Sequence, residues 1–242
     1  EASVDAGPRF VPASQDDLAP SGAKARYAAN IDAIRLLRRL EIDQRPATSD
    51  EQLVLARWSS WGAIPDVFDA SKWNWDTERQ ELKDLLSSDE WAAAERTTIN
   101  AHFTDPLIAR QMWRALTSHG FSGGRVLEPG SGAGTFIGLA PTSAQMTGVE
   151  LDPLTASLSR ALYPHAEVRT ESFANTQMHP GSFDAVIGNV PFSDVKLHDP
   201  VYNAGTGAGR HSMHNHFLIK SLALTRPGGL VVALTSHFTM DS

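Results

Sequence analysis

The chain has 242 residues, of which 41% are hydrophobic, and it carries a formal net charge of −7 and no cysteine. This size and composition fit one α/β domain with a sizeable core and a smaller appendage, and they exclude a chain that is mostly disordered. The lack of cysteine excludes disulfides and thiolate metal sites. The negative charge argues mildly against nucleic acid as a partner, because a DNA-binding domain usually presents a basic face. Such binding would need local patches or protein beyond this chain.

The N-terminal segment shows no targeting signal. No apolar run approaches the roughly 20 residues that span a bilayer, and EASVDAGPRF lacks the basic and apolar regions of a signal peptide. We therefore expect a cytoplasmic protein with no membrane partner. Residues 1–24 are rich in Ala, Pro, Ser, Asp and Gly, which predicts a flexible or draped arm with little regular structure.

Residues 25–99 are predicted to form an N-terminal helical region. A helix over 27–41 carries its apolar side chains on one face and its arginines outside that face. The Ser/Thr-x-x-Glu pattern at Thr48 is a capping box that opens a second helix, and Thr77 and Ser87 are expected to cap two more. The arginines and the five tryptophans of this region could contact nucleic acid, but a solvated helix face and a packed helical layer are the commoner explanations.

Residues 100–242 alternate between short apolar strands and helices, which predicts a Rossmann-like, doubly wound parallel sheet. Strands are expected at 125–129, 146–150, 166–170, 183–188 and 229–236, with helices at 134–140, 153–162 and 214–225. An earlier helix should begin at Pro106, capped by Thr104 or Asp105. Its inward face is expected to carry Ile108, Met112, Ala115 and Leu116. The long loop 193–213 is of a length that is often functional.

A glycine-rich turn follows the first of these strands. It reads Glu128-Pro129-Gly130-Ser131-Gly132-Ala133-Gly134. The missing Cβ atoms let a nucleotide-like ligand lie against backbone N–H groups at the start of a helix. The chain has no G-K-[ST], which disfavours a P-loop NTPase, and the G-x-G-x-G spacing differs from the dinucleotide fingerprint.

Polar residues at the ends of the next two strands indicate which class of ligand the turn would bind. Glu150 ends the second strand, where a carboxylate can accept both ribose hydroxyls of a nucleoside-containing cofactor. Asp152 is better explained as the cap of a following helix. After the third strand, Glu171 and Ser172 could place a polar group on an adenine amine, and Phe173 could lie against its ring. A core role for Phe173 is an equal alternative.

The fourth strand ends in Asn189-Val190-Pro191-Phe192. An exocyclic aromatic amine is a poor nucleophile because its lone pair is delocalised. If the Asn189 side-chain oxygen and the Val190 carbonyl accept its two N–H bonds, the nitrogen moves towards sp³ geometry and can attack a sulfonium methyl in line. Pro191 keeps Val190 extended, and Phe192 offers a face on which a flat base can stack.

With these motifs, the chain resembles the S-adenosylmethionine-dependent N6-adenine DNA methyltransferases of the γ arrangement. The matching segments are VLEPGSGAGTF, GVELDP, GNVPF and the earlier Asn100-Ala101-His102-Phe103-Thr104-Asp105-Pro106. The resemblance covers about residues 98–240. It implies that Phe103 and Thr104 border the methionine end of the cofactor, that Asn189 to Phe192 are catalytic, and that a flipped adenine in DNA is the acceptor.

Two departures from the family pattern stand out. Val190 replaces the first proline of the family tetrapeptide, which restores a backbone N–H. The chain also stops after the fifth strand, where the family sheet continues into further strands and a recognition domain. Of the two explanations, a fragment of a larger protein or a pared-down relative, we favour the fragment and expect an incomplete methyltransferase domain over 100–242 within a larger polypeptide. The upstream segments more weakly resemble regions of large phage- or plasmid-associated helicase-methylase proteins, which suggests restriction-modification or phage defence.

Alternatives to DNA methylation stay open at this point. Protein-glutamine and RNA amine methyltransferases share this type of site, and a non-catalytic cofactor-binding scaffold is a third interpretation. His211, His214 and His216 match no standard zinc spacing and show no evident carboxylate partner, so no metal site is predicted.

Overall fold

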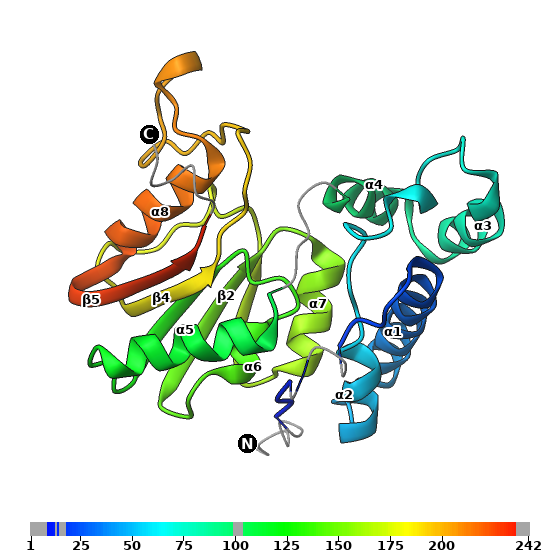
Figure 1. Ribbon diagram of the computed structural model, residues 1–242, viewed down its shortest axis with the longest axis horizontal. Coiled ribbons are helices and arrows are strands. Elements are labelled where there is room, and N and C mark those ends of the chain that lie inside the picture. The colour runs from blue at the N-terminus through cyan, green and yellow to red at the C-terminus, as the bar shows by residue number, and fades with distance from the viewer. Residues whose placement is uncertain (1–8, 13, 15–17, 99–103, 236–242) are drawn as a thin grey trace.

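The computed structural model describes residues 9–12, 14, 18–98 and 104–235. Its centre is a five-stranded, all-parallel sheet in the order β3-β2-β1-β4-β5 (Figure 1). The strands are β1 (Gly124–Pro129), β2 (Ala144–Glu150), β3 (Glu167–Thr170), β4 (Phe183–Asn189) and β5 (Thr225–Leu234). The chain order reverses between β1 and β4, so that the sheet is doubly wound, as the alternating pattern predicted.

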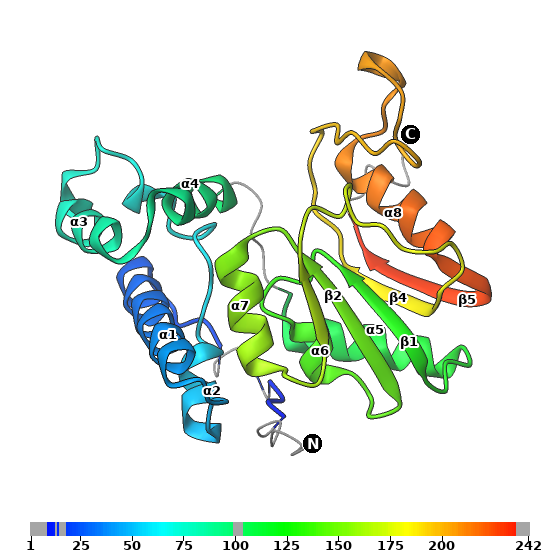
Figure 2. The same cartoon turned by 180° about the vertical axis from the view of Figure 1, so that it is seen from behind.

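Helices cover both faces of this sheet (Figure 2). They are α5 (Pro106–Ser118), α6 (Thr135–Leu139), α7 (Pro153–Leu162) and α8 (Met213–Leu224). Adjacent residues of β1 belong to two different hydrophobic clusters, one on each face of the sheet. Val126 packs with side chains of α5, α6 and α7, and Leu127 packs with Phe217 and Leu224 of α8. This alternation is the period of two expected of a strand buried on both faces.

The N-terminal helices lie beside the β3 edge of the sheet, where the first, second and fourth of them contact α7 (Figure 1). They are α1 (Ala23–Asp43), α2 (Ser49–Leu55), α3 (Asp76–Leu85) and α4 (Ser88–Thr97), with short 3-10 helices at Pro65–Val67, Trp73–Trp75 and, in the later loop, Gly207–Gly209. No helix within the described ranges has both the length and the apolar character needed to cross a membrane.

The local capping signals are mostly confirmed. Thr48 with Glu51 and Ser87 with Glu90 each form a complete capping box. The prediction for Thr77 is wrong, because the 3-10 turn ending at Trp75 runs directly into α3 and leaves Thr77 inside the helix without a capping role. Asp105, and not Thr104, caps α5 by accepting a hydrogen bond from the Leu107 N–H at 2.7 Å.

The predicted inward face of α5 is rotated from the observed one. Ile108 is 45% exposed, whereas Ala109, Trp113 and Leu116 are buried. The Trp113 indole N–H donates to the Phe136 carbonyl at 3.0 Å, which directs this side chain towards α6. The position of the neighbouring helix therefore selected the face, and this information is not contained in the periodicity of α5 itself.

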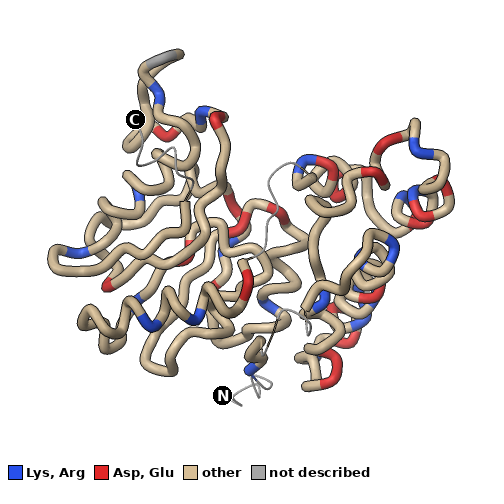
Figure 3. The backbone as a smooth tube through the Cα atoms, in the orientation of Figure 1, with Lys and Arg blue, Asp and Glu red and all other residues tan. Residues whose placement is uncertain are grey.

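The arginines and tryptophans of the helical region serve mainly internal roles. Arg35 pairs with Glu81, and Arg38 pairs with Glu41 and Glu90. Figure 3 shows basic and acidic residues interspersed over these helices. The tryptophans are largely packed inside, as the commoner explanation predicted, with one exception: Trp73 is 81% exposed.

Part of the N-terminal segment is draped over the sheet domain. Phe10 is buried in the main core, and its ring lies 6.4 Å from that of Tyr163. The Arg9 guanidinium donates to the carbonyls of Gly138 and Ala140 at the end of α6. Of the two roles that the composition allowed for this segment, a flexible or a draped one, residues 9 and 10 take the draped one.

Candidate active site at the carboxyl edge of the sheet

The motif residues meet at one edge because parallel strands place all their carboxyl ends together. β1 ends at Pro129, β2 at Glu150 and β4 at Asn189. The Glu171 N–H donates to the Glu150 carbonyl at 3.0 Å. Gly130 lies near Pro191, since a Cβ added to this glycine would be 3.9 Å from the proline ring. The first turn after β1 thus adjoins both the β2 end and the Asn-x-Pro-Phe segment.

The glycine turn has a backbone that only glycine adopts easily. Gly130, Gly132 and Gly134 have φ of 69°, 53° and 86°. The turn is held down by the N–H groups of Gly130 and Ser131, which both donate to the Val149 carbonyl at 2.8 and 3.0 Å. A ligand can therefore approach a turn whose backbone is already fixed and carries no Cβ at Gly130 and Gly132, whereas the missing Cβ of Gly134 makes room for the Tyr163 ring.

Glu150 joins the glycine turn to the turn after β2. One carboxylate oxygen accepts the Gly132 N–H and the other accepts the Asp152 N–H, each at 2.8 Å. A carboxylate offers about four acceptor positions, so two are left for ligand hydroxyls. Burial raises the pKa of Glu150 to about 7, although the hydrogen bonds from Asp152 and Gly132 oppose the rise.

Glu128 is the second acidic group of the site and is 2% exposed. Burial first, and then repulsion from Glu150, raises the pKa of its carboxyl well above the usual range. Its Oε2 has no hydrogen-bond partner among the described residues. A buried carboxyl oxygen without a partner is costly, and it marks a place where a hydrogen-bonding group of a ligand would be favourable.

The turn after β3 divides its three predicted residues between two roles. Glu171 and Ser172 are partly exposed at the edge, and the Ser172 hydroxyl accepts a hydrogen bond from the Ala174 N–H at 3.3 Å. Phe173 is 3% exposed and packs on Phe217, with ring centroids 4.8 Å apart. The structure therefore favours the core role of Phe173 over the role against an adenine ring.

The Asn-x-Pro-Phe segment contains an acceptor of the kind that the chemistry requires. The Asn189 Oδ1 is buried and has no hydrogen-bond partner in the described part of the chain. Phe192 is 44% exposed, so that its ring is available to another flat group. Val190 is buried, and its N–H donates to the Leu234 carbonyl of β5 at 3.1 Å. The N–H that valine restores is therefore used to extend the β4–β5 pairing.

Some predicted and observed features lie at the border of the site. Thr104 is 7% exposed, and Phe103 lies outside the described residues.

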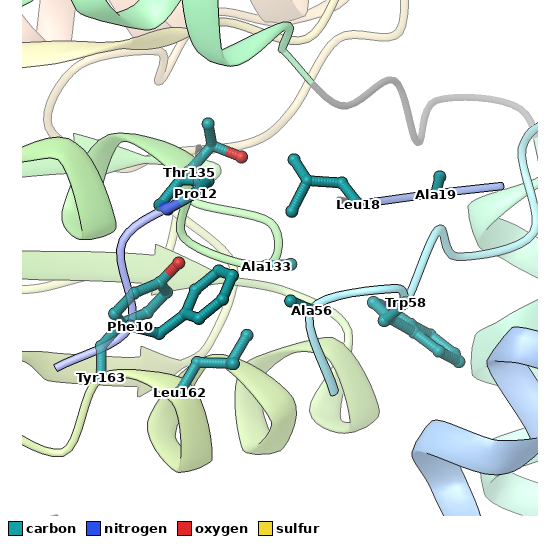
Figure 4. A pocket seen from close by; sticks show the side chains of 10 residues that line it. All are labelled: Phe10, Pro12, Leu18, Ala19, Ala56, Trp58, Ala133, Thr135, Leu162 and Tyr163. Carbon is teal, nitrogen blue, oxygen red and sulfur yellow. The ribbon is translucent and has the colours of Figure 1, made fainter. Parts of the chain in front are cut away.

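A cavity of about 20 Å³ lies behind the glycine turn, where the N-terminal segment meets the sheet domain (Figure 4). It is lined by residues such as Phe10, Trp58, Ala133 and Tyr163. This volume holds about one water molecule, which is far too small for a nucleoside.

Two features of this edge were missed at the level of sequence. Leu151 follows Glu150 and is 67% exposed, which places an apolar side chain beside the predicted ribose ligand. The sequence pattern that could have pointed to Leu151 is an apolar residue directly after the acidic residue that ends a strand. His216 has a carboxylate partner, contrary to the sequence prediction, because its Nε2 donates to Asp199 at 3.0 Å. Within the described ranges, no three His, Asp or Glu side chains gather as a metal site would require.

Comparisons with known proteins relate the chain to methyltransferases. No family model matches the sequence. The type II methyltransferase M.XamI of Xanthomonas campestris pv. amaranthicola is 31% identical over 163 residues, which cover 58% of this chain and 30% of M.XamI. The defense against restriction protein B of Escherichia phage P1 is 27% identical over 142 residues, which cover 57% of this chain and 6% of that protein. The chain thus spans less than a third of either relative.

Among solved structures, a match is found to CalS10, an amino pentose methyltransferase from Micromonospora echinaspora in its S-adenosylmethionine-bound form. It is 22% identical, with a TM-score of 0.39, and the match covers 61% of this chain and 56% of that one. The similarity in sequence to a type II methyltransferase agrees with the predicted methyltransferase activity and with S-adenosyl-L-methionine as the cofactor.

Proposed function

We propose that residues 100–242 form the cofactor-binding and catalytic part of an S-adenosylmethionine-dependent methyltransferase that acts on the N6 amine of adenine in DNA. The observation that carries the proposal is the Asn189 Oδ1, a buried acceptor without a partner among the described residues, at the end of β4 and next to the glycine turn. The similarity to M.XamI supports DNA as the substrate. We assign residues 25–99 to a helical region of the same polypeptide, which packs on α7 and shares its hydrophobic core with the sheet domain.

The residues present fit the proposed cofactor. Gly130 and Gly132 leave the backbone of the turn open to a close ligand, Gly134 lets the turn pack closely on Tyr163, and Glu150 keeps acceptor positions for ribose hydroxyls. The Glu128 Oε2 is a second buried acceptor without a partner in the described ranges. We assign Pro129 to the wall of the same turn, Glu171 and Ser172 to the adenine, Leu151 to an apolar contact with it, and Phe103 and Thr104 to the methionine end.

The chain then acts on the acceptor by orientation and polarisation. When bound, S-adenosylmethionine supplies an electrophilic methyl group on a sulfonium. Asn189 Oδ1 and the Val190 carbonyl accept the two N–H bonds of the amine, which returns lone-pair density to the nitrogen. The bound cofactor would give up this methyl group to the nitrogen and be left as a neutral thioether, and the amine proton would leave to water. Pro191 directs the Val190 carbonyl. Phe192 stacks on the flipped base, and this stacking contributes about 1–3 kcal/mol to binding of the base.

The test is Asn189→Ala in the full-length protein, with transfer of labelled methyl groups to unmethylated duplex DNA as the measurement. Removal of one preorganised polar group in an active site costs about 10²-fold or more in turnover, whereas cofactor binding by calorimetry should change by less than about twofold. Asn74→Ala, an exposed asparagine of the helical region, is the matched control. Label found only in RNA or protein would replace DNA as the acceptor, and cofactor binding with no turnover in the unaltered protein would indicate a scaffold.

The partners follow from the size of the relatives. Because the chain spans 30% of M.XamI and 6% of the phage protein, we assign target recognition to other parts of a larger polypeptide, with a helicase as a further candidate domain. This division also accounts for the net charge of −7, since the basic surface for DNA would lie mainly outside this chain.

A further inference from the structure

Lys220 is a lysine buried within α8, on the face that packs against the sheet. It is 2% exposed, and its ammonium donates to the carbonyls of Phe173 at 2.6 Å and Thr176 at 2.9 Å and to Asp199 Oδ2 at 2.9 Å. An ammonium has three protons to donate, and these three acceptors, with the Ala174 carbonyl farther away at 3.4 Å, satisfy them. Lysine is almost never buried to this degree unless it is paired, so the arrangement fixes each acceptor relative to α8.

Asp199 is the matching buried anion, in the loop that follows Phe192. Its Oδ2 also accepts from His216, and its Oδ1 accepts the N–H groups of Val201 at 2.9 Å and Tyr202 at 3.0 Å. Burial alone would raise the pKa of Asp199, but the hydrogen bonds from Lys220, Tyr202, His216 and Val201 together hold it below its usual range. The carboxylate thus ties the loop to α8 through two donors, Lys220 and His216, while the N–H groups of Val201 and Tyr202 fix it within the loop itself.

Hydrogen bonds join the two sides of the loop 193–212, so the bonds that hold Asp199 also help to set the position of the rest of the loop. The Asn203 side chain donates to the carbonyls of Leu197 at 2.7 Å and His211 at 3.1 Å, which joins the two sides of the loop. The Met213 N–H donates to the Ser193 carbonyl at 3.2 Å and closes its base. In Figure 1 the loop stands above the start of α8 at the carboxyl edge of the sheet.

Lys220 therefore touches two segments with different assignments. Phe173 to Thr176 continue the turn of Glu171 and Ser172, on the cofactor side, and Asp199 belongs to the loop that begins one residue after Phe192, on the acceptor side. A buried ion pair is poor evidence for stability, because a well-packed apolar pair of similar volume is often as stable or more stable. Its distinctive effect here is geometric: one ammonium fixes both segments.

We propose that Lys220 and Asp199 are a positioning pair that couples the cofactor turn 171–176 to the acceptor loop 193–212, so that bound cofactor orders the loop against which the acceptor base is presented. The proposal rests on the proposed function for the assignment of the two segments. Both residues act by positioning, through protein partners alone.

The two partners can be separated by substitution. Asp199→Asn preserves the shape of the side chain, but all four partners of Asp199 are donors and an amide has only one acceptor oxygen, so either orientation sets its NH₂ against donors. Lys220 keeps its bonds to Phe173 and Thr176 in this variant. Lys220→Met breaks those bonds too. Asp199→Asn should therefore release the loop alone, whereas Lys220→Met should release both segments.

The experiment is hydrogen exchange of the full-length protein with and without S-adenosylhomocysteine, at a temperature where circular dichroism shows each variant to be folded. In the unaltered protein the ligand should slow amide exchange in 193–212 by about fivefold or more, which is the low end of allosteric coupling. In Asp199→Asn this protection should disappear while the ligand affinity stays within about threefold. In Lys220→Met the affinity should also fall. Asp194→Asn, exposed in the same loop, should behave as the unaltered protein.

A kinetic split completes the test. Asp199→Asn should raise KM for the acceptor by about fivefold or more with KM for the cofactor nearly unchanged. The coupling would be overturned if bound ligand slowed amide exchange in the loop equally in Asp199→Asn and in the unaltered protein. It would also be overturned if bound ligand left the exchange of the loop unchanged in the unaltered protein. These results leave the proposed function intact. Complete absence of ligand binding in the unaltered protein would overturn both proposals, and absence of methyl transfer to DNA with normal loop protection would overturn only the acceptor.

Discussion

The raised pKa of Glu150 leads to a pH dependence of cofactor binding near neutrality. Ribose hydroxyls donate to a carboxylate, so the ionised form of Glu150 is the one that binds best. With a pKa of about 7, roughly one molecule in ten is ionised at pH 6 and roughly nine in ten at pH 8. The apparent dissociation constant for S-adenosylhomocysteine should then be about tenfold higher at pH 6 than at pH 8.

Calorimetry at pH 6, 7 and 8 measures this effect, and a comparison of buffers with different ionisation enthalpies should show release of about half a proton per ligand at pH 7. Glu150→Gln is the control, because an amide does not titrate. Its affinity should be lower than that of the unaltered protein at pH 8 and should change with pH only as the ligand itself titrates. A dissociation constant that is flat from pH 6 to 8 in the unaltered protein, or an unchanged slope in Glu150→Gln, would refute the assignment.

The same ionisation affects the stability of the ligand-free protein, with a sign that follows from the direction of the shift. The folded protein holds the Glu150 proton more tightly than the unfolded chain, whose pKa is 4.5. The stabilisation is thus complete below pH 4.5 and is lost as the pH rises through about 7, by about 3 kcal/mol at most. In urea unfolding, Glu150→Gln should remove this part of the pH dependence, and bound ligand should offset it.

Two backbone predictions concern the turn and the catalytic segment. Gly134→Ala places a Cβ at positive φ and 2.6 Å from the Tyr163 ring, whereas Gly207→Ala meets only the φ strain, with no atom within 4 Å. Urea unfolding should show a loss of about 1–2 kcal/mol for Gly207→Ala and a clearly larger loss for Gly134→Ala; equal losses would contradict the packing argument. Val190→Pro restores the family proline but removes the bond to Leu234, so it should lower stability by about 1 kcal/mol, and a more stable variant would show that this bond contributes little.

Short-range features of this fold were readable from the residues themselves. The capping boxes at Thr48 and Ser87, the Asp152 cap before Pro153 and the glycine turn all depend on interactions within a few residues, so their patterns specify them. The wrong prediction at Thr77 also has a cause within a few residues. The preceding 3-10 turn, which the pattern did not reveal, moved the helix start to Asp76.

The convergence of the motifs was also predictable, because parallel strands leave their carboxyl ends at one edge whatever their side chains are. That rule placed Glu150 and Asn189 together without coordinates. Whether a given side chain faces the ligand or the core was beyond the pattern. Phe173 is apolar in either role, and only the position of Phe217 on α8 shows that its ring packs in the core.

The sequence by itself determined the alternating α/β order, the local caps and the residue types of the site, since each depends on neighbours along the chain. Only the tertiary structure decided the long-range contacts. It gave the restored N–H of Val190 a partner in β5, it directed the Glu150 carboxylate to the Gly132 N–H, and it joined Lys220 to Asp199 across 21 positions. The physical reason is that a buried polar group must find partners in three dimensions, and the chain order does not say which partners the fold brings near.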